Sequence, residues 1–334
     1  MHKQARVAIV GLLWLAWPAA GQLPEFYKSV DRITWVVEDL DRAVQGWTKL
    51  GFSGIEDRGE VDLESARVRG KPAAAHFRWA AGRLGEVAVD WVQPLSGENA
   101  FSEFLARHGS GVFSLIHRVP SMEAFDTEVA RLGKIGVAPL QTIDLDFESG
   151  TVRIAYMDTE PQGKYGLGLI AGEIEASPLA VAAPGPGSQR ITQYAFAVKE
   201  LEPVSKFWAG LGFPAMNTSR PQMRELRYKD QPGDFDMILG WQRHGKVPYE
   251  FIQSVRGSNV YLDHMARHGE GVHHIAFNVS EMDKEVARWN DLGFAYSMGG
   301  AWGEKDKPGS GRFVYLDTQA IGGTDVELLW NYKP

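Results

Sequence analysis

Large apolar residues alternate with small or polar ones in four stretches of the chain, which is the pattern of a β-strand with two different faces. The stretches are ITWVV from residue 33, FSLIH from 113, QYAFAV from 193 and HHIAF from 273. A helical pattern follows each of them and ends at a Leu-Gly pair, where glycine is typical of a helix stop. Shorter strand-like runs come next, so the pattern predicts four β-α-β-β-β modules of about 75 to 80 residues.

The four modules pair into two halves. ARHGSGV at 106 returns as ARHGEGV at 266, and YMDT at 156 returns as YLDT at 315. His108 and His268 recur in both copies beside a glycine turn, which indicates a structural role for them. Residues 172–189 are rich in Pro, Gly and Ala and are typical of a linker. We therefore expect an α+β fold in which the modules form two half-barrel domains, at 22–171 and 190–334.

The faces of the predicted strands indicate which residues point into a cleft. In HHIAF, the bulky face with His273 and Phe277 suits packing against the helix of the module. The opposite face carries His274 and the small Ala276, and Gln193 occupies the same face of the third module's first strand. We expect Gln193 and His274 to face the cleft and His273 to face away from it.

The closing strand of each module adds one residue to the same cleft. Glu250 in YEFIQ lies 57 residues after Gln193, and Glu327 in VELLW lies 53 residues after His274. At the equivalent places, the first half has residues that form no ligand set: Arg32, Asp90, Ser114 and Gly168.

Two carboxylates in one cleft need a compensating charge. At 4 Å they repel each other by about 4 kcal/mol at an effective dielectric constant near 20, which is a large share of a stability of roughly 5 to 15 kcal/mol. Adding a glutamine and a neutral histidine gives three oxygen ligands and one nitrogen ligand, a set that suits a divalent ion. The sequence therefore predicts one metal site, in the second half, from Gln193, Glu250, His274 and Glu327.

The composition and the N-terminus limit the cellular location and the partners that we expect. Residues 1–21 have basic residues, an apolar run and then small residues, which predicts a secretory signal peptide and a periplasmic or extracellular protein. There is no cysteine, and the net charge is −7, so we expect no thiolate site and no nucleic-acid partner. Export disfavours glutathione and acyl-coenzyme A as substrates, and no membrane association is expected after cleavage.

At these residues the chain resembles the vicinal oxygen chelate superfamily, which includes glyoxalase I, methylmalonyl-CoA epimerase, extradiol dioxygenases and 4-hydroxyphenylpyruvate dioxygenase. GEGVHHIAF and GRFVYLDT with VELL are most similar to the epimerase group. The resemblance implies two glyoxalase-like domains, with metal ligands at Gln193, Glu250, His274 and Glu327, a set similar to that of glyoxalase I. The dioxygenases share the chain layout but use two histidines and one carboxylate, and the first histidine would fall at Gln193.

The resemblance implies a metal-dependent isomerase, epimerase or lyase that moves a proton next to a carbonyl, with Glu327 or Glu250 as the base. The expected substrate is a small molecule with two neighbouring oxygens. The expected ion is Zn, Ni, Co or Mn, with Fe less favoured. Two alternatives stay open, an iron-dependent dioxygenase of the same fold and a non-catalytic small-molecule-binding protein. A homodimer is also compatible with the sequence.

Overall fold

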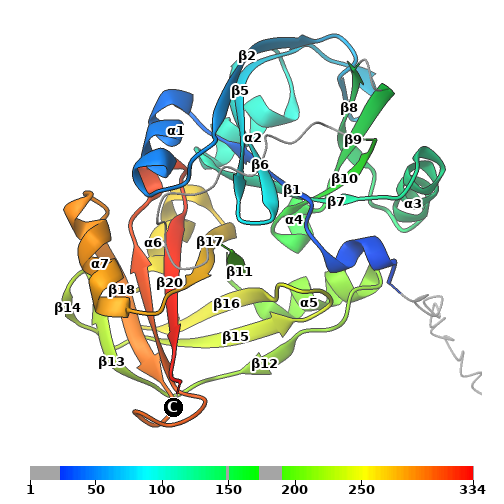
Figure 1. The fold of residues 1–334 in the computed structure, drawn as a ribbon. Coiled ribbons are helices and arrows are strands. Elements are labelled where there is room, and N and C mark those ends of the chain that lie inside the picture. The colour runs from blue at the N-terminus through cyan, green and yellow to red at the C-terminus, as the bar shows by residue number, and fades with distance from the viewer. Residues whose placement is uncertain (1–22, 148–149, 173–189, 334) are drawn as a thin grey trace, which may run out of the picture.

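The computed structural model describes residues 23–147, 150–172 and 190–333 (Figure 1). The predicted signal peptide and nearly all of the predicted linker lie outside these ranges. Two curled ten-stranded sheets with helices packed on them form the described part of the chain, which confirms the predicted α+β class and the two half-barrel domains. Within these ranges, no helix combines the length and the apolarity that a membrane span requires.

The first half has the strand order β2-β5-β6-β1-β7-β10-β9-β8-β3-β4. Its strands are β1 (Arg32–Val36), β2 (Glu56–Leu63), β3 (Arg67–Val68), β4 (Lys71–Pro72), β5 (Ala75–Leu84), β6 (Val87–Ser96), β7 (Gly111–Arg118), β8 (Pro139–Phe147), β9 (Gly150–Met157) and β10 (Gly166–Ala171). Its helices are η1 (Glu25–Lys28), α1 (Leu40–Lys49), α2 (Ala100–His108), α3 (Met122–Lys134) and α4 (Glu160–Gly163).

The second half repeats this order as β12-β15-β16-β11-β17-β20-β19-β18-β13-β14. Its strands are β11 (Ile191–Val198), β12 (Asn217–Ser219), β13 (Met223–Tyr228), β14 (Gln231–Pro232), β15 (Asp236–Gln242), β16 (Tyr249–Arg256), β17 (Gly271–Asn278), β18 (Tyr296–Trp302), β19 (Gly311–Leu316) and β20 (Asp325–Asn331). Its helices are α5 (Leu201–Gly210), α6 (Val260–His268), α7 (Met282–Asp291) and η2 (Gln319–Ile321).

The modules of each half join edge to edge. In the second half, the first strands of the two modules, β11 and β17, pair antiparallel at the centre of the sheet. The closing strands β16 and β20 pair parallel with β11 and β17, respectively. The two modules therefore form one curved sheet, and the four strands that carry the predicted ligands are neighbours at its centre.

The two halves share one hydrophobic core. Three tryptophans, each three residues before the leucine of a Leu-Gly pair, are fully buried in it: Trp47, Trp208 and Trp289. The indole of Trp208 donates a hydrogen bond to the carbonyl of Gly163 in the first half, at 2.9 Å, and stacks on Tyr165 with ring centroids 4.4 Å apart. Because this core extends across both sheets, the halves meet within a single chain.

A reciprocal contact between two histidines also joins the halves. His108 Nδ1 donates to the backbone carbonyl of His268, and His268 Nδ1 donates to that of His108, both at 2.6 Å. The structural role that we predicted for these residues is confirmed. They end the helices α2 and α6, which the sequence reasoning did not predict, and each of these helices is capped at its start by an asparagine, Asn99 or Asn259.

Burial makes His117 on β7 a source of acid sensitivity. The ring is fully buried, its Nδ1 donates to the carbonyl of Ser29 at 2.8 Å, and burial lowers its pKa to about 4. The ordinary value of about 6.5 applies in the unfolded chain, so the stabilising effect is present above pH 6.5 and is lost as the pH falls toward 4. We expect this residue alone to lower the free energy of unfolding by about 2 kcal/mol between pH 7 and pH 5.

Urea unfolding of the wild type and of His117→Asn at several pH values measures this effect. The asparagine keeps a donor near the Nδ1 position but does not titrate. The variant should therefore lose less stability than the wild type between pH 7 and pH 5. If the free energy of unfolding depended on pH in the same way in both proteins, His117 would be ruled out as a source of the pH dependence.

Candidate metal centre

The four sequence-predicted ligands lie together at the centre of the second sheet. Gln193 on β11, Glu250 on β16, His274 on β17 and Glu327 on β20 are all buried. The register explains this meeting, because Ala195 pairs with both Glu250 and His274, and Ala276 pairs with both Gln193 and Glu327. Residues 57 and 53 positions apart in the sequence are thereby brought to adjacent strands.

Three of these side chains are close enough to share one ion. One ligand atom each from Glu250, His274 and Glu327 lies within 4.8 Å of the other two. His274 Nε2 is 3.2 Å from Glu327 Oε2 and 3.9 Å from Glu250 Oε2. The fourth residue, Gln193, donates from Nε2 to Glu250 Oε2. This is the only such His, Asp or Glu group in the described ranges.

The charges of this group are not balanced by the surrounding side chains. Neither Glu250 nor Glu327 has an ion pair with a lysine or arginine in the described part of the chain. Burial raises the pKa of Glu250 well above its usual range, and the nearby charge of Glu327 raises it further. His274 Nε2 and Glu327 Oε2 are buried without a hydrogen-bond partner. Unpaired buried acceptors and two adjacent carboxyls fit a divalent cation.

The ring of His274 is held from its other nitrogen. His274 Nδ1 lies 2.8 Å from His273 Nδ1, so one of these two atoms carries the shared proton. Burial lowers the pKa of His273 well below its ordinary value, which keeps that ring neutral. With the proton on His274 Nδ1, its Nε2 keeps a lone pair that faces the two carboxylates, as metal ligation requires.

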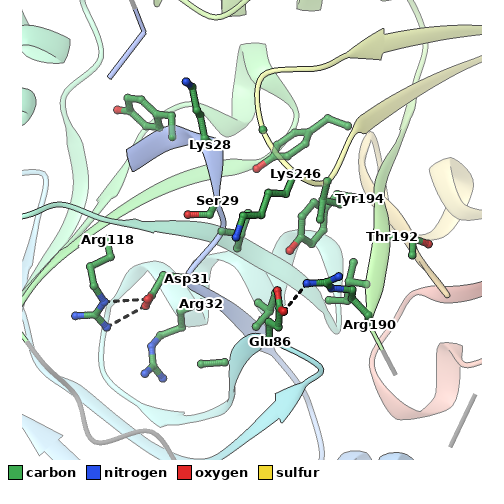
Figure 2. Close-up of a pocket in the computed structure, with 18 of the residues that line it drawn as sticks. Lys28, Ser29, Asp31, Arg32, Glu86, Arg118, Arg190, Thr192, Tyr194 and Lys246 are labelled. Carbon is green, nitrogen blue, oxygen red and sulfur yellow. Dashed lines mark hydrogen bonds and ion pairs between the residues drawn. The ribbon is translucent and has the colours of Figure 1, made fainter. Parts of the chain in front are cut away.

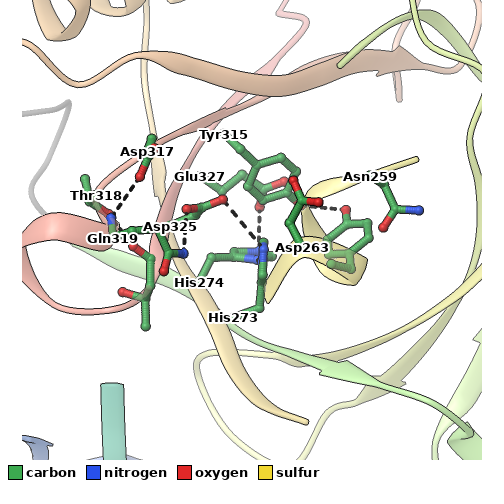
Figure 3. A network of polar contacts seen from close by, with 12 residues as sticks. Asn259, Asp263, His273, His274, Tyr315, Asp317, Thr318, Gln319, Asp325 and Glu327 are labelled. Atoms are coloured by element: carbon green, nitrogen blue, oxygen red, sulfur yellow. Dashed lines mark hydrogen bonds and ion pairs between the residues drawn. The ribbon is translucent and has the colours of Figure 1, made fainter. Parts of the chain in front are cut away.

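The position of His273 corrects the sequence-based expectation. Ala195 pairs with His274 and Phe196 pairs with Val272, so His273 is the extra residue of a β-bulge. The bulge turns the ring of His273 to the cleft side of the sheet, away from the side that α7 covers. On the cleft side the ring packs against Tyr261 and His264 of α6 and against Tyr315 of β19. Figure 3 shows His273 next to His274. The Nε2 of His273 lies 3.7 Å from Asp325 Oδ2. His273 is not part of the group of potential ligands.

A cavity of about 370 Å³ opens beside the centre. Gln193, Glu250 and Glu327 are in its wall, together with the phenols of Tyr261 and Tyr315, which contact each other at 2.9 Å. Most of the remaining wall is apolar: Met223, Met237, Leu239, Trp241, Trp302 and Phe313. No lysine or arginine lines this cavity in the described part of the chain. The potential ligands therefore border a small, mainly apolar chamber.

The equivalent place in the first half is closed by side chains. Arg32 forms a buried ion pair with Asp90 at 2.6 Å, and the hydroxyl of Ser114 donates to the carbonyl of Gly166 at 2.9 Å. Gly168 has no room for a side chain, because a Cβ there would lie 2.5 Å from Ile116 and 2.8 Å from Ser114 Oγ. Here a guanidinium neutralises the carboxylate, and the arrangement is complete without an ion.

Comparison with known proteins agrees with the duplicated fold. The family model described as the Glyoxalase/Bleomycin resistance protein/Dioxygenase superfamily matches residues 31–185 and 192–315. A mutant of 4-hydroxymandelate synthase from Streptomyces coelicolor is 16% identical, with a TM-score of 0.59 over 91% of this chain and 92% of that one.

A xylose isomerase-like TIM barrel/4-hydroxyphenylpyruvate dioxygenase fusion protein is 17% identical, with a TM-score of 0.54. The match covers 97% of this chain and 51% of the fusion protein. At such identities the likeness concerns the fold. Because the family model covers most of both halves, the chain belongs to the Glyoxalase/Bleomycin resistance protein/Dioxygenase superfamily, the vicinal oxygen chelate superfamily that its motifs resemble.

Proposed function

We propose that this chain is a metal-dependent enzyme that transfers a proton at a carbon next to a carbonyl, with an isomer, an epimer or a lyase product as the outcome. The observation that carries the proposal is the buried group of Glu250, His274 and Glu327, which borders a small cavity and forms no ion pair with a lysine or arginine of the described residues. These three residues and Gln193 would hold the ion. Zn, Ni, Co and Mn suit the mixed oxygen and nitrogen set.

A bound divalent ion supplies Lewis acidity to two neighbouring oxygens of the substrate. The protein supplies the base. Glu250 or Glu327 takes the proton from the carbon next to the carbonyl, holds it on a carboxylate oxygen and returns it to another face or another carbon. The apolar walls exclude water, and Gln193 fixes the orientation of the Glu250 carboxyl through its amide.

The cavity lining favours one class among the possible substrates. Three aromatic residues, Trp241, Trp302 and Phe313, and several aliphatic ones face the space beside the ligands. Among the residues that the structure describes, no basic side chain lines this space, so a phosphorylated or multiply charged substrate would find no cationic partner among them. We propose a small, largely apolar hydroxyketone, keto acid or aromatic compound with two adjacent oxygens. We also propose that the enzyme binds this substrate outside the cytoplasm, on the basis of the signal-like sequence at 1–21.

An iron-dependent oxygenase is the second candidate. A 4-hydroxyphenylpyruvate dioxygenase fusion protein is among the structural neighbours. Non-heme iron oxygenases typically use two histidines and one carboxylate. The centre here has one histidine, with Gln193 and a second glutamate in addition, which favours proton transfer over oxygen chemistry. A non-catalytic binding protein would be the third reading of the same cavity.

Metal analysis and isotope exchange test these alternatives. We expect the purified protein to contain about one equivalent of Zn, Ni, Co or Mn per chain, and to catalyse exchange of a substrate proton with deuterium from solvent. Nuclear magnetic resonance of a panel of hydroxyketones and keto acids in D₂O detects the exchange. Bound iron with oxygen uptake would replace the proposal by the oxygenase, and no stoichiometric metal would leave only a binding function.

A further inference from the structure

A second and larger cavity lies between the two halves. Its volume is about 850 Å³, and none of the four proposed metal ligands lines it. The first half contributes the segment from Tyr27 to Arg32 and the turn between β5 and β6, and the second half contributes the start of β11 and the loop before β16 (Figure 2). The cavity is thus separate from the proposed reaction site, and both domains build it.

Positive charge is concentrated in this cavity. Its acidic lining residues are Asp31 and Glu86, whereas six lining residues are basic: Lys28, Arg32, Arg83, Arg118, Arg190 and Lys246. The whole chain has a net charge of −7. A basic cavity in an acidic protein concentrates anions locally, because the charges in a concave site act together.

The ion pairs within the lining leave two cations unmatched. Arg118 holds Asp31 through two contacts, at 2.8 and 3.0 Å, and Arg190 pairs with Glu86 (Figure 2). The two acidic residues of the lining are therefore already neutralised.

Lys28 and Arg32 also have carboxylate partners, Glu25 and Asp90, both at 2.6 Å. Arg83 donates to the backbone carbonyl of Glu86, and neither Arg83 nor Lys246 forms an ion pair with a carboxylate of the described ranges. One unmatched cation comes from each half of the protein.

Hydrogen-bond donors without acceptors accompany these charges. Arg32, Tyr194 and Tyr249 line the cavity with at most 2% of their surface exposed, and Arg32 Nε and the two phenol oxygens have no hydrogen-bond partner in the described part of the chain. Burial raises the pKa of both tyrosines, so the phenols remain donors. Unmatched buried donors are unfavourable, and an oxyanion would supply the missing acceptors.

The loop that carries Lys246 is fixed against the first half. The backbone N–H of Lys246 donates to the carbonyl of Lys28 at 3.1 Å. The preceding residue must be glycine, because a Cβ at Gly245 would lie 2.0 Å from the same carbonyl oxygen. Arg83, near the end of β5, lines the same cavity from the first half. The main chain at Lys246 is therefore held against the half of the protein that carries Arg83.

We propose that this interdomain cavity binds a small oxyanion with two or more negative charges, either a phosphate group or a di- or tricarboxylate. Lys246 and Arg83 would contact the anion from the two halves, and the buried donors would take up its remaining oxygens. This site is independent of the proposed metal chemistry. Because its ligand would touch both domains, binding would stabilise their packing against each other.

Calorimetric titration and thermal unfolding of the full chain test the proposal, with inorganic phosphate and citrate as separate probes in low-ionic-strength chloride buffer. We expect about one site per chain for at least one probe, and a rise in Tm that decreases when NaCl screens the charges. Lys246→Gln and Arg83→Gln should each weaken binding about tenfold or more, since each removes a charge-assisted hydrogen bond. Stronger binding of phosphate than citrate would identify a phosphate site, and the reverse a carboxylate site.

Lys206→Gln is the matched control, since this exposed lysine on α5 has the same charge change and does not line the cavity. It should bind like the wild type, as should Glu327→Gln at the metal centre. Lys246 is exposed, so its variant should fold normally without the anion. Equal affinity in wild type, Lys246→Gln and Arg83→Gln would overturn the proposal, and so would the absence of saturable binding of both probes.

Discussion

Glu327→Gln is expected to abolish stoichiometric binding of a divalent metal, while the metal-free variant remains at least as stable as the metal-free wild type. The substitution removes one ligand from the group of Glu250, His274 and Glu327. Loss of a residue that only supports a ligand typically costs 10- to 100-fold in metal affinity, so loss of a ligand itself should cost roughly a hundredfold or more. Elemental analysis after gel filtration measures the metal content.

The substitution is expected to weaken metal binding but not to lower the stability of the metal-free protein. Without an ion, the buried carboxyls of Glu250 and Glu327 lie side by side, and the raised pKa of Glu250 reflects its burial and this repulsion. The amide has nearly the same shape as the carboxylate and has no charge to desolvate. Thermal unfolding with EDTA should therefore give an equal or higher Tm for the variant, whereas added metal should raise only the Tm of the wild type.

The duplicated fold provides a matched control for this experiment. Ser114 in the first half occupies the register position that His274 occupies in the second half, and it donates only to the carbonyl of Gly166. Ser114→Ala should retain the metal at the wild-type stoichiometry. If Glu327→Gln retained the metal too, or unfolded much more easily than the metal-free wild type, Glu327 would be a structural residue and not a ligand.

The central strands and the metal centre could be predicted because the information is local and repeated. Alternation along β11 and β17 defines the two faces of each strand. The spacings of 57 and 53 residues in the second half differ by only one residue from the 58 and 54 of the first, which identifies Glu250 and Glu327 as residues of the same face. A duplicated sequence also contains an internal comparison. Where the second half has His274, the first has Ser114, so a functional position could be separated from a structural one within a single chain.

Other features depend on contacts between distant residues and could not be predicted in this way. A β-bulge shifts the alternation by one residue, and nothing in HHIAF marks it, so His273 was assigned to the wrong face. The same shift occurs in the first half, where Phe113 is the extra residue. It packs into a hydrophobic cluster of that half, with Phe101 and Tyr156. Because both copies have the bulge, comparing them could not reveal it.

Helix α6 has a start signal and a stop signal in the sequence, although the strand pattern alone does not predict it. Asn259 is a favourable N-cap, and Gly269 follows the last helical residue, as expected for a helix of nine residues. The fragment ARHG alone predicts only a turn. Helix α6 places Tyr261 in the wall of the cavity and His264 against His273, so it supplies much of the surroundings of the metal centre.

Asp90→Ala in the first half is expected to lower the free energy of unfolding by about 3 to 5 kcal/mol. Asp90 and Arg32 form a buried ion pair at 2.6 Å, with side-chain exposures of 11% and 3%. Burial raises the pKa of Asp90 even though Arg32 lies beside it, which indicates that desolvation opposes the attraction within the pair. Removing the carboxylate leaves the guanidinium buried without its counter-charge, and this is the main cost.

Urea unfolding monitored by tryptophan fluorescence, in buffer without multivalent anions, measures this loss. The double variant Arg32→Met with Asp90→Leu should recover most of the stability, because apolar residues of similar volume replace a buried ion pair with little cost. A loss below about 1 kcal/mol for Asp90→Ala, or a double variant no more stable than the single one, would contradict the assignment. The metal content should not change in either variant. Together with stoichiometric metal that is lost in Glu327→Gln, this result would show that the two halves compensate a buried carboxylate differently. An arginine neutralises it in the first half, and a bound ion does so in the second.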